Sequence, residues 1–173
     1  MKKETKIAVI ILGVLVVIMA VALFLNQGAI EENQATFDKV ELKILENGEE
    51  VAILSYEELI LLGAEEFQAV YDTSDSDGVM EQYTGVELRV ILESLGISLE
   101  DKSTVTLTAV DNYAVAYSAS EVAMEGNVYV TFEREGEALL GKEDGGQGPL
   151  QTIVVSDSFS NRRCKWLISI GVE

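Results

Sequence analysis

Three cationic side chains, Arg162, Arg163 and Lys165, lie within four positions near the C-terminus of a strongly acidic chain. The 173 residues carry a net charge of −18. Arginine binds phosphate through two parallel N–H donors, and lysine contributes a compact positive charge. The cluster therefore predicts a binding site for an anion. Ion pairing with the chain's own abundant carboxylates is the open alternative.

Two further segments have residue types that bind ligands. The acidic segment Asp72 to Gly78, DTSDSDG, brings three carboxylates close together, as a calcium site requires, although it lacks the full EF-hand spacing. An acidic surface turn explains it equally well. The segment Gly141 to Gly148, GKEDGGQG, has four glycines that would let backbone N–H groups approach a phosphate. A flexible hairpin loop is its alternative reading.

The composition excludes several kinds of site. The chain has no histidine, which removes a Ser-His-Asp triad, a histidine-bearing zinc site and an axial histidine for haem. Its single cysteine, Cys164, cannot form an intramolecular disulfide, and its place beside Trp166 predicts a buried thiol. The acidic balance argues against a nucleic-acid partner, because phosphate contacts require a basic surface.

The N-terminus predicts a location outside the cytoplasm. Residues Ile7 to Leu25 form a run without charge or proline, long enough for a membrane-spanning helix. Lysines precede the run and acidic residues follow it, so the positive-inside rule places 1–6 in the cytoplasm and the rest outside. We expect a signal anchor at 7–25, a tether at 26–36 and one domain at 37–173. A cleaved signal peptide, ending near Ala20 to Ala22, is the alternative.

Alternating apolar and polar residues predict a β-rich α+β domain with two or three short helices. A capping box formed by Ser55 and Glu58 predicts the start of a short helix. The expected strands are Phe37–Leu45, Glu50–Leu54, Glu66–Tyr71, Thr104–Ala109, Tyr113–Tyr117, Val128–Arg134, Thr152–Val155 and Cys164–Ile170, and the expected helices are Tyr56–Leu62 and Val86–Leu95.

Three segments in this order resemble a known family. They are YTGVELRVILESLGI (Tyr83 to Ile97), VDNYAVAYSASEV (Val110 to Val122), and GPLQTIVVSD followed by RRCKWLISI (Gly148 to Ile170). Together they resemble the oxidoreductase molybdopterin-binding domain, which has the sulfite oxidase-like fold, over roughly Phe37 to Val172. Each motif alone is weakly specific, and the ordered set is more specific.

The resemblance implies a β-rich mixed-sheet domain that holds a molybdopterin-type cofactor in a cleft and works outside the cytoplasmic membrane. It also implies a redox partner protein or a small anionic ligand. The residues assigned to the cofactor by the resemblance are Arg162, Arg163 and Lys165 against the pterin phosphate, Gly148 and Pro149 beside the metal, and Asp111 and Tyr113 along the cleft.

One departure from the family pattern concerns the metal ligand. Catalytic members bind molybdenum through a cysteine thiolate, and the corresponding segment here, residues 67–85, has no cysteine. By spacing, Asp72, Thr73 and Ser74 occupy the nearest positions, whereas Cys164 belongs to a different motif. Oxygen ligands would give the metal a different electronic environment from a thiolate. Two functions therefore stay open: an oxidoreductase, or a non-catalytic ligand- or partner-binding module of the same fold.

Overall fold

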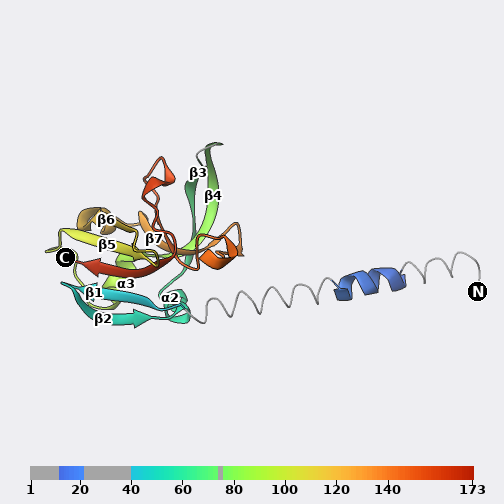
Figure 1. Ribbon diagram of the computed structural model, residues 1–173, viewed down its shortest axis with the longest axis horizontal. Helices are drawn as coiled ribbons and strands as arrows, with labels where there is room; N and C mark the ends of the chain where they lie inside the picture. The colour runs from blue at the N-terminus through green and yellow to red at the C-terminus, as the bar shows by residue number, and fades with distance from the viewer. Residues whose placement is uncertain (1–11, 22–39, 74–75) are drawn as a thin grey trace, which may run out of the picture. The chain divides into compact units, whose positions relative to one another are not determined.

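The computed structural model describes residues 12–21, 40–73 and 76–173 (Figure 1). The chain divides into two units, Met1–Ala35 and Thr36–Glu173. In the first unit residues 12–21 are helical. The remainder of the expected anchor and the whole expected tether lie outside the described residues. Among the described residues no helix is both long and apolar enough to span a membrane.

One five-stranded sheet has the order β2-β1-β10-β5-β6 (Figure 1). Its strands are β1 (Leu42–Glu46), β2 (Glu49–Leu54), β5 (Thr104–Ala109), β6 (Ala114–Ser118) and β10 (Leu167–Val172). β1 and β10 are parallel and the other pairs antiparallel, so the sheet is mixed. The β1–β2 hairpin turns at Asn47 and Gly48, both with positive φ, as an Asn-Gly turn requires.

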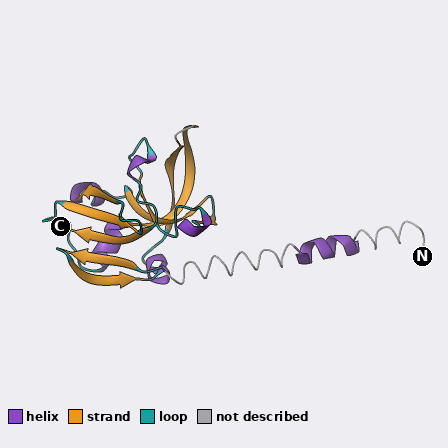
Figure 2. Cartoon of the chain, viewed as in Figure 1, coloured by secondary structure: helices purple, strands orange, loops and turns teal. Residues whose placement is uncertain are grey.

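A second sheet has the order β3-β4-β7-β8, with β9 also paired to β7. Its strands are β3 (Glu65–Thr73), β4 (Ser76–Glu87), β7 (Val128–Arg134), β8 (Glu137–Ala138) and β9 (Gln151–Val154). Figure 2 shows β3 and β4 as a long hairpin that extends beyond the other strands. In the acidic segment Asp72–Gly78, Thr73 ends β3 and pairs with Ser76, and Gly78 lies within β4, so the described part of this segment is extended strand.

The helices are short, and α2 (Tyr56–Leu61) begins where the sequence signals it. It starts with the predicted capping box between Ser55 and Glu58. The others are α3 (Leu88–Ser94), α4 (Ala119–Val122), and the 3₁₀ turns η1 (Lys142–Asp144) and η2 (Ser160–Arg162). α3 begins two residues later than expected, because β4 continues to Glu87 before the chain turns helical.

The main core lies between the two sheets. Buried side chains from β1, β5 and β10 of the first sheet, β7 of the second, and α3 form one apolar cluster. A smaller cluster of Ala69, Tyr83 and Ile153, with Phe67 packed against it, forms separately around β3, β4 and β9. Burial of apolar side chains on this scale is the main favourable term in folding. The fold is thus a β-rich mixed α+β domain, as predicted.

The final strand begins later than expected. β10 starts at Leu167, so Arg163 to Trp166 approach it as irregular chain, and Trp166 has a φ of +53°. The register to β5 shifts between Leu167 and Ser169. As a result Ile170 is fully buried while Ile168 is 40% exposed. A sequence pattern cannot show such a bulge, because the ladder itself creates it.

Candidate functional site

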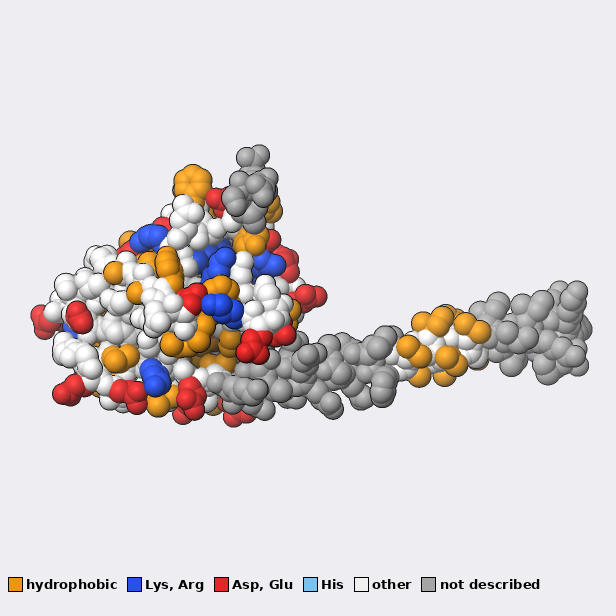
Figure 3. All heavy atoms as spheres, viewed as in Figure 1, with side chains coloured by type: hydrophobic (Ala, Val, Ile, Leu, Met, Phe, Trp, Pro, Cys, Tyr) orange, Lys and Arg blue, Asp and Glu red, His pale blue; other side chains and the backbone are white. Residues whose placement is uncertain are grey.

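Two of the three clustered cations line one cleft. The cleft has a volume of about 330 Å³ and lies between η2, the turn after β5 and the chain leading into β10. We call it the cationic cleft; its lining residues are Asp111, Tyr113, Ser160, Asn161, Arg163, Lys165 and Trp166. Figure 3 shows Lys and Arg side chains gathered in the middle of the face in view, with many Asp and Glu side chains toward its margins. The volume is at the lower end for small-molecule sites.

Arg163 is a buried cation whose hydrogen-bond partners are neutral. The residue is 7% exposed; its Nη1 donates to the Tyr83 hydroxyl at 2.9 Å and its Nη2 donates to the Val70 carbonyl. The guanidinium also lies over the Tyr83 ring, 5.0 Å from its centroid. Within the described ranges no carboxylate lies within ion-pair distance of Arg163. Its positive charge therefore remains available to an anion in the cationic cleft.

Lys165 lies beside Arg163 in the cleft wall. The side chain is partly buried, and the described part of the chain offers it no hydrogen bond or ion pair. A lysine ammonium without a partner is a strongly hydrated point charge that is free to bind an anion. Arg163 and Lys165 together make this the site where the acidic chain presents positive charge without balancing it.

The Arg162 side chain points away from the cationic cleft, toward two carboxylates. Its guanidinium donates to both carboxylate oxygens of Glu121, at 2.6 and 3.1 Å, and to both of Asp157, at 2.5 and 3.0 Å. These two carboxylates raise its pKa further above the ordinary arginine value. Arg162 does not line the cationic cleft. The alternative of ion pairing with the chain's own carboxylates is therefore what the structure shows for this residue.

Asp111 and Tyr113 form the opposite wall of the cleft. Asp111 accepts the Tyr113 N–H at 3.1 Å, which closes a turn around Asn112, a residue with φ of +66°. Lys142 pairs with Asp111 at 3.1 Å and lies over the Trp166 ring at 4.3 Å. The Tyr113 N–H and then Lys142 lower the pKa of Asp111 below its usual value. Asp111 is therefore a charged carboxylate already neutralised by Lys142.

Gly148 and Pro149 line a different, larger groove of about 590 Å³. Trp166 stands between the two, since it lines both. A side chain at Gly148 would meet Leu139, with a Cβ only 2.5 Å from the Leu139 carbonyl oxygen. Close packing of backbone on backbone explains this glycine, and Gly146 is packed in the same way on Leu140. Gly146 and Gly148 are thus required by packing, and the assignment of Gly148 and Pro149 to the cofactor stays a prediction.

Two of the three candidate metal-ligand positions, Asp72 and Thr73, are the last residues of β3. The Asp72 carbonyl accepts a hydrogen bond from the Ser160 hydroxyl at 2.8 Å, which ties η2 to the strand. Ser74 lies outside the described residues. No group of three or more Asp, Glu, His or Cys side chains that would hold a metal occurs in the described ranges.

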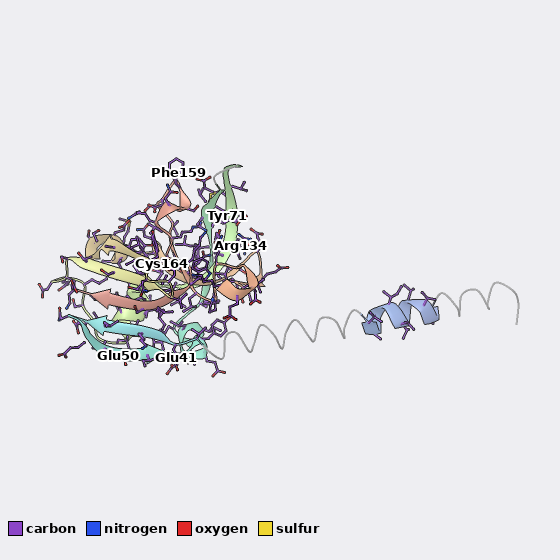
Figure 4. The ribbon with its side chains drawn as sticks, viewed as in Figure 1. Glu41, Glu50, Tyr71, Arg134, Phe159 and Cys164 are labelled. Atoms are coloured by element: carbon purple, nitrogen blue, oxygen red, sulfur yellow. The ribbon has the colours of Figure 1, made fainter. Side chains whose placement is uncertain are left out.

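Cys164 is enclosed in the main core, as predicted. It is fully buried (Figure 4 places it inside the fold), and its backbone N–H donates to the Thr152 hydroxyl at 3.1 Å. Burial, and to a smaller degree the charge of Asp111, raises the pKa of the thiol to about 11. The side chain is therefore a protonated, apolar core group.

The sequence reasoning did not identify the tyrosines behind the cleft. Tyr71 lies beneath two guanidinium groups, with Arg134 at 4.7 Å and Arg163 at 5.8 Å from its ring centroid. Figure 4 shows Tyr71 and Arg134 close together. These residues come from β3 and β7, which are not neighbours in the second sheet, so no local pattern joins them. Aromatic faces stabilise cations that have few carboxylate partners.

A protein family and a solved structure are similar to this chain. The profile described as oxidoreductase molybdopterin binding domain matches residues 31–173. Among solved structures, the sulfane dehydrogenase SoxCD from Paracoccus pantotrophus is similar, with a TM-score of 0.62 and 17% sequence identity. The match covers 78% of this chain and 38% of that one, so the chain spans well under half of that structure. At this identity the match concerns the fold. No curated protein matches the sequence.

Proposed function

The chain belongs to the oxidoreductase molybdopterin-binding domain family, and from this premise we propose that its cationic cleft binds a molybdopterin-type cofactor. The observation that carries the proposal is the pair of unbalanced cations, Arg163 and Lys165, in the cleft of a chain with net charge −18. A pterin cofactor bears a phosphate, and these are the side-chain types that bind phosphate.

In the proposed complex the protein holds and orients the anionic part of the cofactor. Lys165 binds the phosphate as a mobile point charge, and Arg163 supplies a fixed positive charge, because Tyr83 and Val70 hold its guanidinium in place. The Ser160 hydroxyl, already bonded to Asp72, and the Asn161 side chain complete the polar wall. The redox chemistry of such a group is supplied by its metal and not by the protein.

The donor set fits one part of this cofactor and not the other. The cleft offers cations and hydroxyls that fit a phosphate. The chain offers no thiolate for a metal, because its one cysteine lies in the core. No catalytic step through a metal follows from these residues.

We further propose that the domain lies outside the cytoplasm, anchored by a single span over residues 7–25. The sequence of this segment and its flanking lysines support the proposal. A redox partner protein, or a small anionic ligand, would then meet the cationic cleft on that side of the membrane. The net charge argues against a nucleic-acid partner.

The cofactor proposal is tested on the full chain purified from its native host. Acid release followed by pterin fluorescence should give about one pterin per chain. A protein free of pterin would overturn the proposal. The location is tested by adding protease to intact cells: degradation of the domain is the expected result, and protection against protease until the cells are lysed contradicts it.

A further inference from the structure

We infer that the cationic cleft retains its ligand through the ligand's anionic group alone and holds no metal ion, so that the domain is a binding module and not a redox catalyst. The identity of the ligand rests on the proposed function, whereas the absence of a metal anchor is a separate point about this chain's own side chains. The inference follows from two observations: the cleft has side chains that fit an anion, and the described part of the chain lacks side chains that fit the metal.

The one thiol of the protein lies away from the cationic cleft. The chain has one cysteine, and Cys164 belongs to the main core, where it is fully buried. Both of its backbone hydrogen bonds go to Thr152 in β9: its N–H donates to the hydroxyl, and its carbonyl accepts the Thr152 N–H at 3.0 Å. The thiol cannot reach the cationic cleft without unfolding this part of the chain. The protein therefore offers no thiolate to molybdenum or tungsten in this cleft.

The described lining of the cationic cleft also lacks a free imidazole or carboxylate ligand for a metal. Histidine is absent from the whole chain. The one carboxylate in the cleft, Asp111, is bonded to Lys142 and to the Tyr113 N–H, so a metal would compete with Lys142 for its negative charge. The described ranges contain no other cluster of metal-ligating side chains. In addition, Arg163 and Lys165 repel a cation from the cleft as strongly as they attract an anion.

The positive charges of Arg163 and Lys165 have no carboxylate partner among the described residues. A buried guanidinium costs free energy unless an opposite charge or many hydrogen bonds compensate it. Arg163 has two neutral hydrogen-bond acceptors and two aromatic neighbours, and Lys165 has no partner in the described part of the chain. Binding of an anion repays this cost directly. The anion site is therefore favourable by itself and does not depend on a metal to complete it.

One experiment measures metal and pterin on the same sample. The full chain, purified from its native host without chelator, is assayed for molybdenum and tungsten by mass spectrometry and for pterin after acid release. We expect about one pterin per chain with far less than one metal ion. One metal ion per pterin overturns this inference and leaves the proposed function intact, most directly if the metal is lost in Asp72→Ala or Ser74→Ala.

A second experiment measures the anion site alone with inorganic phosphate as the probe. Calorimetric titration of the full chain, produced in a host that makes no molybdopterin so that the cationic cleft is free of pterin, should show phosphate binding that Lys165→Ala weakens by about tenfold and Lys165→Glu abolishes. Lys43→Ala is the matched control, because Lys43 lies on β1, outside the cationic cleft, and its removal changes the net charge equally. Binding unaffected by both Lys165 variants, or no phosphate binding, overturns the inference.

The two experiments separate the two conclusions. A protein without pterin that still binds phosphate through Lys165 contradicts the proposed cofactor and supports the anion site. Pterin with a stoichiometric metal contradicts only the absence of a metal anchor. Reaction of Cys164 with a thiol reagent gives a third readout: labelling should occur only at the rate of unfolding, and fast labelling of the native chain contradicts the enclosed thiol.

Discussion

Arg162 and Arg163 are neighbours in the chain, yet their guanidinium groups lie in opposite electrostatic surroundings. Arg162 has two carboxylate partners, Glu121 and Asp157, and its side chain is 40% exposed. Arg163 is nearly buried, with a carbonyl and a tyrosine hydroxyl as partners. The contrast teaches that a run of basic residues is not one functional unit. Arg162 links η2 to two carboxylates, and Arg163 is the cation that we propose attracts the ligand.

The largest change in stability should come from Arg163→Met. This substitution leaves the Val70 carbonyl without its donor and removes the guanidinium from the Tyr83 hydroxyl, so we expect the free energy of unfolding to fall by about 2 kcal/mol. Denaturant unfolding followed by Trp166 fluorescence measures it. A gain in stability would show instead that the buried charge costs more than its hydrogen bonds return.

Tyr117→Phe tests the contact that holds the backbone of Arg162. The Tyr117 hydroxyl donates to the Arg162 carbonyl at 2.6 Å and lies 3.0 Å from the Thr152 hydroxyl, in a buried setting. Its loss should lower the free energy of unfolding by about 1.5 kcal/mol, because the two partners remain buried. Phosphate binding should weaken only slightly. Full stability in this variant would contradict the structural role of the contact.

Arg162→Ala should be milder despite the removal of four charge-assisted hydrogen bonds. The group is partly exposed, so solvent screens it, and we expect a loss of about 1 kcal/mol. The loss should decrease in high salt, which weakens the repulsion between Glu121 and Asp157. Arg162→Lys is the matched control that keeps the charge. If Arg162→Ala abolished phosphate binding, the separation of the two arginines would be wrong.

Lys165→Ala should change stability least. No hydrogen bond or ion pair of this side chain exists among the described residues, so the free energy of unfolding should change by less than about 0.5 kcal/mol. A larger loss, measured by the same denaturant unfolding, would reveal a structural role. The combination of unchanged stability and weakened anion binding is the signature that distinguishes a binding residue from a structural one.

The pH dependence of Asp111 provides the finest test. Its pKa in the folded state is lowered, so its contribution to stability is present above the ordinary aspartate value and is lost as the pH falls through the lowered pKa. The free energy difference between wild type and Asp111→Asn should therefore be constant near neutral pH and should shrink in acid. A difference that grows in acid would contradict the pairing with Lys142.

Much of the fold was predictable from local patterns. The strands Thr104–Ala109 and Val128–Arg134 match their predicted bounds, and the capping box at Ser55 marks the start of α2. β4 was missed, because its first residues, Ser76 to Gly78, have turn composition and extend only through pairing with β3. The start of β10 was missed because Trp166 adopts a positive φ that its residue type does not suggest.

The site was predictable in part. Arg163, Lys165, Asp111 and Tyr113 line one cleft, and the sequence had named all four. Tyr71, Tyr83 and Arg134 were not assigned to the site, although Tyr83 opens one of the three family motifs. The expected membrane anchor and the contribution of Ser74 stay predictions.

The sequence by itself determined which chemistry the protein lacks. The chain has no histidine and a single cysteine, so it offers no imidazole ligand and at most one thiolate. Only the tertiary structure decided which of the adjacent cations is free. That choice depends on distance: Glu121 and Asp157 reach Arg162 across the fold, while Arg163 turns toward β3 and β4. The residue type determines the charge of a side chain, whereas its position in the fold determines whether a carboxylate lies close enough to neutralise that charge.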